Sequence, residues 1–166
     1  SSKNQSNLAS FNPKLKSTST IEYDQKGARI LDVKVTDLRG NQVNILEHGK
    51  QYYYSYQVKI SHPLHQVKLS FLLKQKNGTA IGGGVYPSMI ENIEQLNKGI
   101  NVKFKITANL AQGEYFFNAG IQAIYNNKQD YVHRILDAYM VKVINQSPDM
   151  TGIVKIVDES GYEEYK

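Results

Sequence analysis

Apolar and polar side chains alternate along most of this chain, and the pattern is clearest between Leu110 and Ile144. Two stretches here have a period of two and are joined by the polar turn at residues 126–130. That period is typical of strands with one face in a core. The side chains expected in the core are Tyr115, Phe117, Ala119, Ile121 and Ala123 in the first stretch, and Tyr139, Val141 and Val143 in the second.

The same alternation predicts further strands at residues 29–38, 51–61, 66–76 and 100–108, with weaker ones at 79–85 and 152–157. Asn77-Gly78 is a strong hairpin signal. Residues 88–97 fit either an amphipathic helix or an irregular connection. About seven or eight strands at this spacing indicate an all-β fold, an immunoglobulin-like antiparallel β-sandwich. The expected inward sets are Leu31, Val33 and Val35; Tyr52, Tyr54, Tyr56, Val58 and Ile60; Val67, Leu69, Phe71 and Leu73; and Ile100, Val102, Phe104 and Ile106.

The outward face of 110–144 is apolar and amide-bearing rather than charged. In the immunoglobulin order, residues 66–76, 113–125 and 131–144 share a sheet. Leu72, Phe116, Ile124 and Met140 then form an apolar stripe beside Asn118 and Gln122. Sugar sites need flat apolar surface for the ring and planar polar groups for its hydroxyls. The stripe therefore fits a saccharide, and it fits a subunit contact equally well.

A second cluster lies around the turn. His133-Arg134 begins the last long strand beside Tyr131, with Tyr125 and Asn126 across the turn. Arginine pairs bidentately with phosphate or carboxylate, so this cluster suits an acidic cap on a ligand. Ordinary loop polarity is the alternative interpretation.

Composition narrows the function classes. The net charge is +5, but the lysines are scattered, which argues against nucleic-acid binding. There is no cysteine, and no apolar run approaches the ~20 residues needed to cross a bilayer. No nucleophile has a plausible base, and His62 and His65 lack further ligands nearby, so we expect no catalytic residue, metal or cofactor. Residues 1–26 read as a flexible linker or arm, 27–157 as the sandwich and 158–166 as an acidic tail.

Several short sequence motifs, most of them at predicted turns, occur in a characteristic order. Through these motifs, residues 27–157 resemble the C-terminal carbohydrate-binding domain of Wzt-type ATP-binding subunits, which belong to bacterial ABC transporters that export O-antigen polysaccharides. The motifs are Gly27-Ala28-Arg29-Ile30, Asp37-x-x-Gly40, Asn77-Gly78-Thr79-Ala80-Ile81, Leu110-x-x-Gly113-x-Tyr115, Asp137-Ala138-x-x-Val141-x-Val143 and Gly152-Ile153-Val154.

The resemblance implies a non-catalytic module at the cytoplasmic face of the inner membrane. It would recognise the modified non-reducing terminus of an O-antigen polysaccharide and couple that recognition to export. Residues 1–26 would tether it to an ATPase domain, which acts with a membrane subunit. The resemblance also implies a homodimer in which the strand 152–157 is exchanged.

No motif of the family carries ligand residues over to this chain, so the candidate site is taken from the residues alone. The alternative function is a structural or protein-interaction sandwich, such as an adhesin or assembly module. A glycan-modifying enzyme is a third, weaker hypothesis. The candidate ligand-binding residues are Leu72, Phe116, Asn118, Gln122, Tyr125, Tyr131, His133, Arg134 and Met140.

Overall fold

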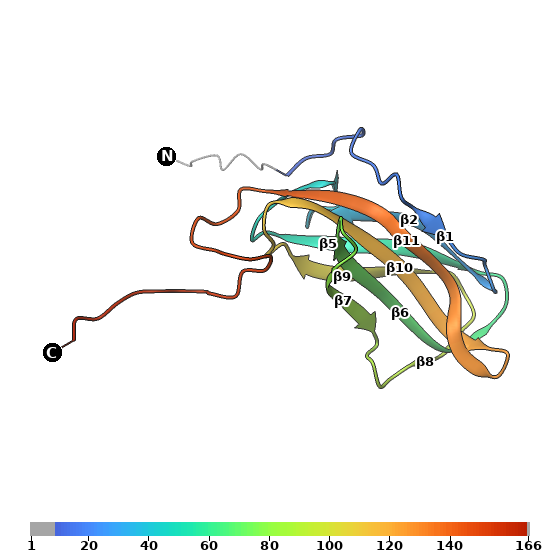
Figure 1. Ribbon diagram of the computed structural model, residues 1–166. Coiled ribbons are helices and arrows are strands. Elements are labelled where there is room, and N and C mark those ends of the chain that lie inside the picture. Colours follow the sequence, from blue (N-terminus) through green and yellow to red (C-terminus); the bar gives the residue numbers. More distant parts are fainter. Residues whose placement is uncertain (1–8, 166) are drawn as a thin grey trace.

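Two β-sheets face each other in the computed structural model, which describes residues 9–165 and contains no helix in that range (Figure 1). Seven of its eleven strands are longer than four residues. In chain order the strands are β1 (Ile21–Glu22), β2 (Ala28–Thr36), β3 (Gln42–Val43), β4 (Ile45–Glu47), β5 (Gln51–Ile60), β6 (Leu64–Gln75), β7 (Ala80–Tyr86), β8 (Ile93–Leu96), β9 (Ile100–Thr107), β10 (Gly113–Tyr125) and β11 (Lys128–Ile144).

The larger sheet has the order β1-β11-β10-β6-β7, with β4 added beside β11 and β8 beside β6. The smaller sheet has the order β3-β2-β5-β9. All strand pairs are antiparallel except β4 with β11, which run parallel. The predicted β-sandwich is therefore confirmed, as is the prediction that residues 66–76, 113–125 and 131–144 share one sheet.

The core lies between the sheets and is built from the alternating positions that the sequence predicts. Tyr54 of β5 is fully buried and stacks on Phe117 of β10, with 4.4 Å between the ring centroids. Tyr52, Tyr56 and Val58 of β5 are buried beside it. Burial of such large side chains supplies most of the free energy that holds the two sheets together.

A β-bulge in β2 removes Leu31 from one predicted inward set, whereas Val35 lies in the core and Val33 packs against it. Leu31 pairs with Gln57 and Lys34 with Ser55, so β2 has one more residue than β5 over this stretch. Asp32 accommodates the extra residue with a φ of 50°. Ile30 and Val35 are consequently buried, whereas Leu31, predicted to face the core, is only half-buried.

The structure also decides one open prediction and corrects another. Residues 88–97 form an irregular loop followed by β8, which pairs with β6. The strand expected at 152–157 is absent from the described chain, where only Val154 forms a single bridge, to Leu110. The backbone there bonds within the same chain, because the Ala111 N–H donates to the Ile153 carbonyl at 2.7 Å.

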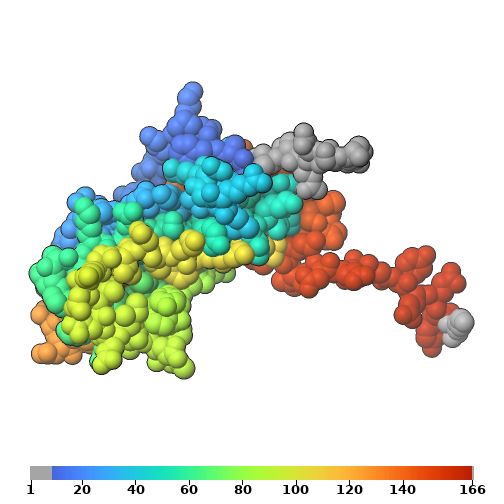
Figure 2. All heavy atoms as spheres, turned by 180° about the vertical axis from the view of Figure 1, so that it is seen from behind, coloured from blue at the N-terminus to red at the C-terminus, as the bar shows by residue number. Residues whose placement is uncertain are grey.

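The two ends of the chain behave differently. The expected flexible arm includes residues 1–8, which lie outside the described residues, but 9–26 run along the sandwich and include β1, which is paired with β11. The expected acidic tail is described as far as residue 165. It is exposed, and Figures 1 and 2 show it extending away from the sheets. No helix of a length and hydropathy suited to crossing a bilayer occurs within 9–165.

Candidate functional site

The outer face of the larger sheet carries a groove of about 400 Å³. Its floor comes from three neighbouring strands, β6, β10 and β11, and the loop after β7 forms one wall. The residues that line this groove are Lys68, Ser70, Phe71, Leu72, Val85, Met89, Asn118, Ala119, Gly120, Gln122, Gln129, Tyr131 and Arg134.

The strand register places the groove residues in two transverse rows. Lys68, Gln122 and Tyr131 are partners across β6, β10 and β11. Ser70, Gly120 and Arg134 form the adjacent row. Residues two apart on a strand share a face, and this relation holds for β6 and β10.

On β11 the two row members are three residues apart, and a bulge makes this possible. Ile121 pairs with His133 and Gln122 with Tyr131, so Val132 is an extra residue. Val132 and His133 are both buried, while Tyr131 and Arg134 are half-buried on the outer face. The bulge therefore brings an aromatic ring and a guanidinium group to the same groove.

Gly120 forms the middle of the floor and determines where the Tyr131 ring lies. A Cβ atom at Gly120 would be 2.7 Å from the Tyr131 ring and 3.3 Å from the Ser70 hydroxyl. The ring therefore lies close over the glycine backbone. The Arg134 guanidinium lies 4.8 Å from the Tyr131 ring centroid and 5.9 Å from that of Tyr23.

Tyrosines of the smaller sheet fix the floor from below. The Tyr54 hydroxyl donates to the Asn118 carbonyl at 2.9 Å, and the Tyr56 hydroxyl bonds the carbonyls of Ser70 and Gly120 at 2.9 and 3.0 Å. Burial raises the pKa of Tyr54 and of Tyr56, so both hydroxyls remain protonated donors. The groove floor is thus held by buried hydrogen bonds across the sandwich.

The wall at residues 87–92 is attached to the floor by side chains. The Lys68 ammonium donates to the Ser88 carbonyl at 3.0 Å and to the Glu91 carbonyl. The Gln129 amide donates to the Gln66 carbonyl at 2.9 Å and to the Asn92 side chain at 3.0 Å. Met89 projects from this wall beside the groove and is 76% exposed.

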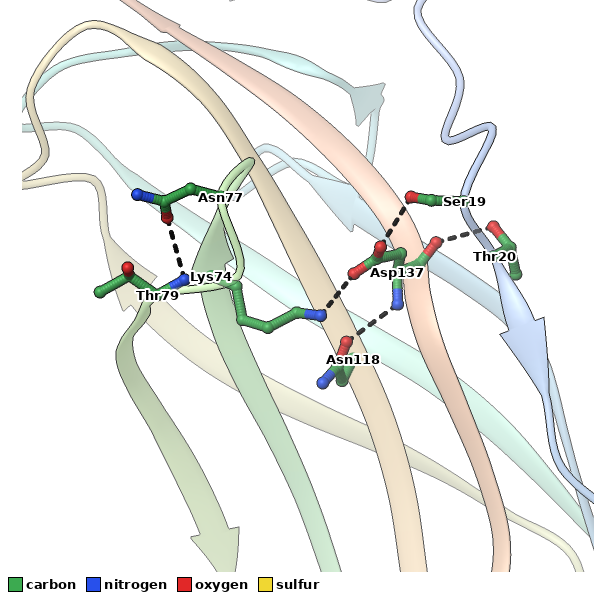
Figure 3. A network of polar contacts seen from close by, with 7 residues as sticks. All are labelled: Ser19, Thr20, Lys74, Asn77, Thr79, Asn118 and Asp137. Carbon is green, nitrogen blue, oxygen red and sulfur yellow. Dashed lines mark hydrogen bonds and ion pairs between the residues drawn. The ribbon is translucent and has the colours of Figure 1, made fainter.

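Beyond the rows, a polar network fixes a second irregularity of β11 (Figure 3). Phe117 pairs with Tyr139 and Ala119 with Ile135, so β11 has two extra residues there, and Asp137 has a φ of 49°. The Asp137 N–H donates to Asn118 Oδ1 at 2.9 Å, and Lys74 of β6 reaches across β10 to within 2.7 Å of the Asp137 carboxylate.

The N-terminal segment joins this network. The Ser19 hydroxyl donates to the Asp137 carboxylate at 2.6 Å, and the Thr20 hydroxyl donates to the Asp137 carbonyl at 2.7 Å (Figure 3). Asp137 lies within β11 and not at a strand end. One carboxylate therefore connects β6, β11 and the segment that precedes β1.

Five of the nine candidate ligand residues lie together in the groove: Leu72, Asn118, Gln122, Tyr131 and Arg134. Phe116 and Met140 are cross-strand partners further along the sheet, and Phe116 is only 8% exposed. Tyr125 lies at the end of β10 and lines a different hollow, with the Lys26 ammonium 5.2 Å from its ring centroid.

His133 is on the opposite face from Arg134. Its Nδ1 accepts a hydrogen bond from the Ile30 N–H at 2.8 Å, so in the neutral ring the proton is on Nε2, 3.1 Å from a Glu22 carboxylate oxygen. Burial lowers the pKa of His133, although Glu22 acts in the opposite direction. The structure does not bring this residue to the groove, because consecutive strand residues point to opposite faces.

Sequence reasoning did not select several residues of the groove. Lys68 and Ser70 alternate with the buried Val67 and Leu69, so parity alone would have placed them on the outer face beside Leu72. The same alternation along β10 could have placed Gly120 on the outer face. Met89 and Gln129 carry no such signal, because their positions depend on how the connecting loops fold.

The groove combines flat apolar groups with amides and cations. The domain that carries it is similar to known proteins. A family model described as the Wzt C-terminal domain matches residues 19–156. A crystal structure of the C-terminal domain of Wzt has a TM-score of 0.74 and 21% identity, covering 90% of this chain and 91% of that chain.

A crystal structure of the CARDB domain of a Pyrococcus furiosus protein, in complex with di-metal ions, has a TM-score of 0.41 and 15% identity. It covers 74% of this chain and 93% of that chain. No protein of curated function matches the chain.

Proposed function

Because the chain belongs to the Wzt C-terminal domain family, we propose that it is a non-catalytic module whose groove binds the non-reducing end of an O-antigen polysaccharide. The family match covers the sandwich together with residues 19–26, which run along β11. In this proposal the bound end, rather than the repeating interior of the polymer, is what the domain recognises.

The chemistry of the groove supports this proposal more than any other observation. The Tyr131 ring, Leu72 and Met89 offer apolar surface for the C–H face of a sugar ring. The Gln122 amide can both donate to and accept from hydroxyls, whereas Asn118 offers its N–H donors and Gln129 its amide oxygen, because their other polar atoms already bond protein groups. A volume of about 400 Å³ is within the range of small-ligand sites, and it suits one terminal residue with its modification.

The wider context of the proposal follows the family. The domain would act at the cytoplasmic face of a bacterial inner membrane, joined through its N-terminal segment to an ATP-binding domain that works with a membrane subunit. It would be a homodimer, with residues 152–157 exchanged between protomers. Ile156 is 86% exposed, so the apolar positions of this segment are available for such a contact.

A titration with the capped polysaccharide tests the proposal. We expect chemical-shift changes centred on Gly120, Gln122 and Tyr131, and an affinity measurable by calorimetry. Tyr131→Ala removes the apolar platform and is expected to weaken binding about tenfold, or about 1.4 kcal/mol. Tyr53→Ala is the matched control, because Tyr53 is a half-buried tyrosine of the smaller sheet with the Lys103 ammonium 4.1 Å from its ring centroid.

Absence of any shift in the groove with the folded domain would contradict the proposal. The alternative, a protein-interaction sandwich, is favoured by Met89 and Ile90, which are 76% and 92% exposed on the loop beside the groove. An Ile90→Ser variant separates the two functions, because Ile90 is exposed on this loop and is not among the residues that line the groove. Loss of self-association with unchanged polysaccharide affinity would assign that loop to a protein contact.

A further inference from the structure

Taking the proposed function as its premise, we propose that the groove selects an oxyanion on the glycan terminus, either a phosphate ester or a carboxylate. Two cations, Lys68 and Arg134, line the groove, and no aspartate or glutamate is among its described lining residues. Neutral sugars are bound largely through hydroxyls, which carboxylate acceptors serve well. A lining with cations and without carboxylates favours a ligand that supplies the acceptors itself.

Lys68 makes the groove floor electropositive. The residue is 9% exposed, and its ammonium bonds two loop carbonyls, both of them neutral acceptors. An ammonium group has three N–H donors, so one remains available after these two bonds. Within residues 9–165 no carboxylate lies within ion-pair distance of Lys68. A buried charge without an opposite charge is costly, and an anion in the groove would offset that cost.

Arg134 offers the matching hydrogen-bond geometry. Its guanidinium group lies near the rings of Tyr131 and Tyr23 and forms no ion pair in the described part of the chain. A planar guanidinium can bind a phosphate or carboxylate through two parallel N–H···O bonds. The tyrosine rings restrict the side chain, which lowers the entropy lost when such a pair forms.

The neighbouring cations differ from these two. Lys74, on the same sheet face, is neutralised by Asp137 at 2.7 Å. The hollow on the other side of Arg134 contains Asp24 and Asp130 as well as Lys26, so its charges balance when Arg134, which also lines it, is included. Lys68 and Arg134 are therefore cations that line the groove and form no ion pair with a carboxylate in the described part of the chain.

Three monosaccharide probes test this inference directly: methyl β-D-glucoside 6-phosphate, methyl β-D-glucuronide and neutral methyl β-D-glucoside, each titrated at constant ionic strength. We expect groove resonances to shift with at least one anionic probe at concentrations tenfold below those needed for the neutral one. Comparison of the first two probes distinguishes a phosphate ester from a carboxylate.

Arg134→Gln should reduce the affinity for the preferred anionic probe at least tenfold and leave the neutral probe within twofold. Arg39→Gln is the control, because Arg39 is an exposed turn residue and the net charge changes equally. Arg134→Lys keeps the charge but loses the bidentate fork, so its affinity should be intermediate. Retained dispersion of the amide spectrum shows that each variant is folded.

The outcomes separate this inference from its premise. Equal binding of neutral and anionic probes in the groove overturns the anion inference and leaves the proposed glycan function standing. Equal losses with Arg134→Gln and Arg39→Gln also overturn it, because they indicate general charge attraction. If neither the probes nor the capped polysaccharide shift any groove resonance, the proposed function itself fails.

Discussion

Gly120 shows how a single residue shapes the groove. Its φ lies outside the left-handed region, so its backbone conformation does not require glycine. What favours glycine is the Tyr131 ring, whose nearest atom would be only 2.7 Å from a Cβ atom at this position. The residue therefore sets the position of the ring, while the fold itself tolerates a side chain there.

Gly120→Ala should consequently change binding without unfolding the domain. Reduced freedom of the unfolded chain stabilises the variant by about 0.4–1 kcal/mol, which offsets part of the cost of displacing the ring. We expect the free energy of unfolding to stay within about 1 kcal/mol of the parent and glycan affinity to fall about tenfold. Urea denaturation and calorimetry measure the two quantities, and unchanged affinity would contradict this role of the ring.

At the scale of elements, the long strands were predictable and their irregularities were not. Alternation identified β5, β6, β9 and β10 with the correct inward faces, because buried apolar side chains impose a period of two. The bulges at Asp32, Val132 and Asp137 leave no mark on that period until the partner strand is known. Hence Leu31 was placed in the core, and His133 was placed beside Arg134 although the two lie on opposite faces.

The composition of the segment before β1 did not predict its hydrogen bonds to the sandwich. Its Ser, Asn and Thr residues suggested disorder, yet they hydrogen-bond to the sandwich. Asn44 is 2% exposed, and its amide group bonds the Asn12 N–H at 2.8 Å and the carbonyls of Asn12 and Leu15 at 2.7 and 3.1 Å. A polar segment is held here by hydrogen bonds from one buried side chain, which composition cannot reveal.

Asn44→Ala should release residues 9–18 while the sheets remain intact. Loss of three hydrogen bonds at a buried site should lower the free energy of unfolding by about 1–3 kcal/mol. Hydrogen exchange followed by mass spectrometry should show faster exchange in peptides covering 9–18 and unchanged protection in β10. Asn101→Ala, at an exposed position of β9, is the matched control. Equal protection of 9–18 in parent and variant would contradict this role of Asn44.

For the whole molecule, the buried His133 couples stability to pH. Burial lowers its pKa below the ordinary value of 6.5, so the unfolded chain binds this proton more readily than the folded one. The stabilising contribution is complete above pH 6.5 and is lost as the pH falls towards the folded pKa. Asp37 and Asp149 have lowered pKa values too, but they act only around and below their ordinary 3.8.

The folded domain should therefore lose stability between pH 7 and pH 5 with a slope of at most about 1.4 kcal/mol per pH unit, that of one proton. His133→Gln should flatten this slope, because its amide oxygen can accept the Ile30 N–H without titrating. His62→Gln, at an exposed position, should preserve it. Urea midpoints measured at half-unit pH intervals decide the matter, and an unchanged slope in His133→Gln would exclude this histidine as the cause.

The polar network around Asp137 affects how the domain would respond to force. A displacement transmitted along the chain towards β1 reaches the sandwich first through the Asn44 contacts, and then through Ser19, Thr20 and the two residue pairs of β1. These contacts are few and break one after another. They should therefore separate at a lower force than the long β10–β11 ladder. Tension would thus loosen the Asn44 contacts first and Asp137 next. Because the Asp137 N–H bonds Asn118 of the groove floor, movement of the segment before β1 would reach the proposed ligand site.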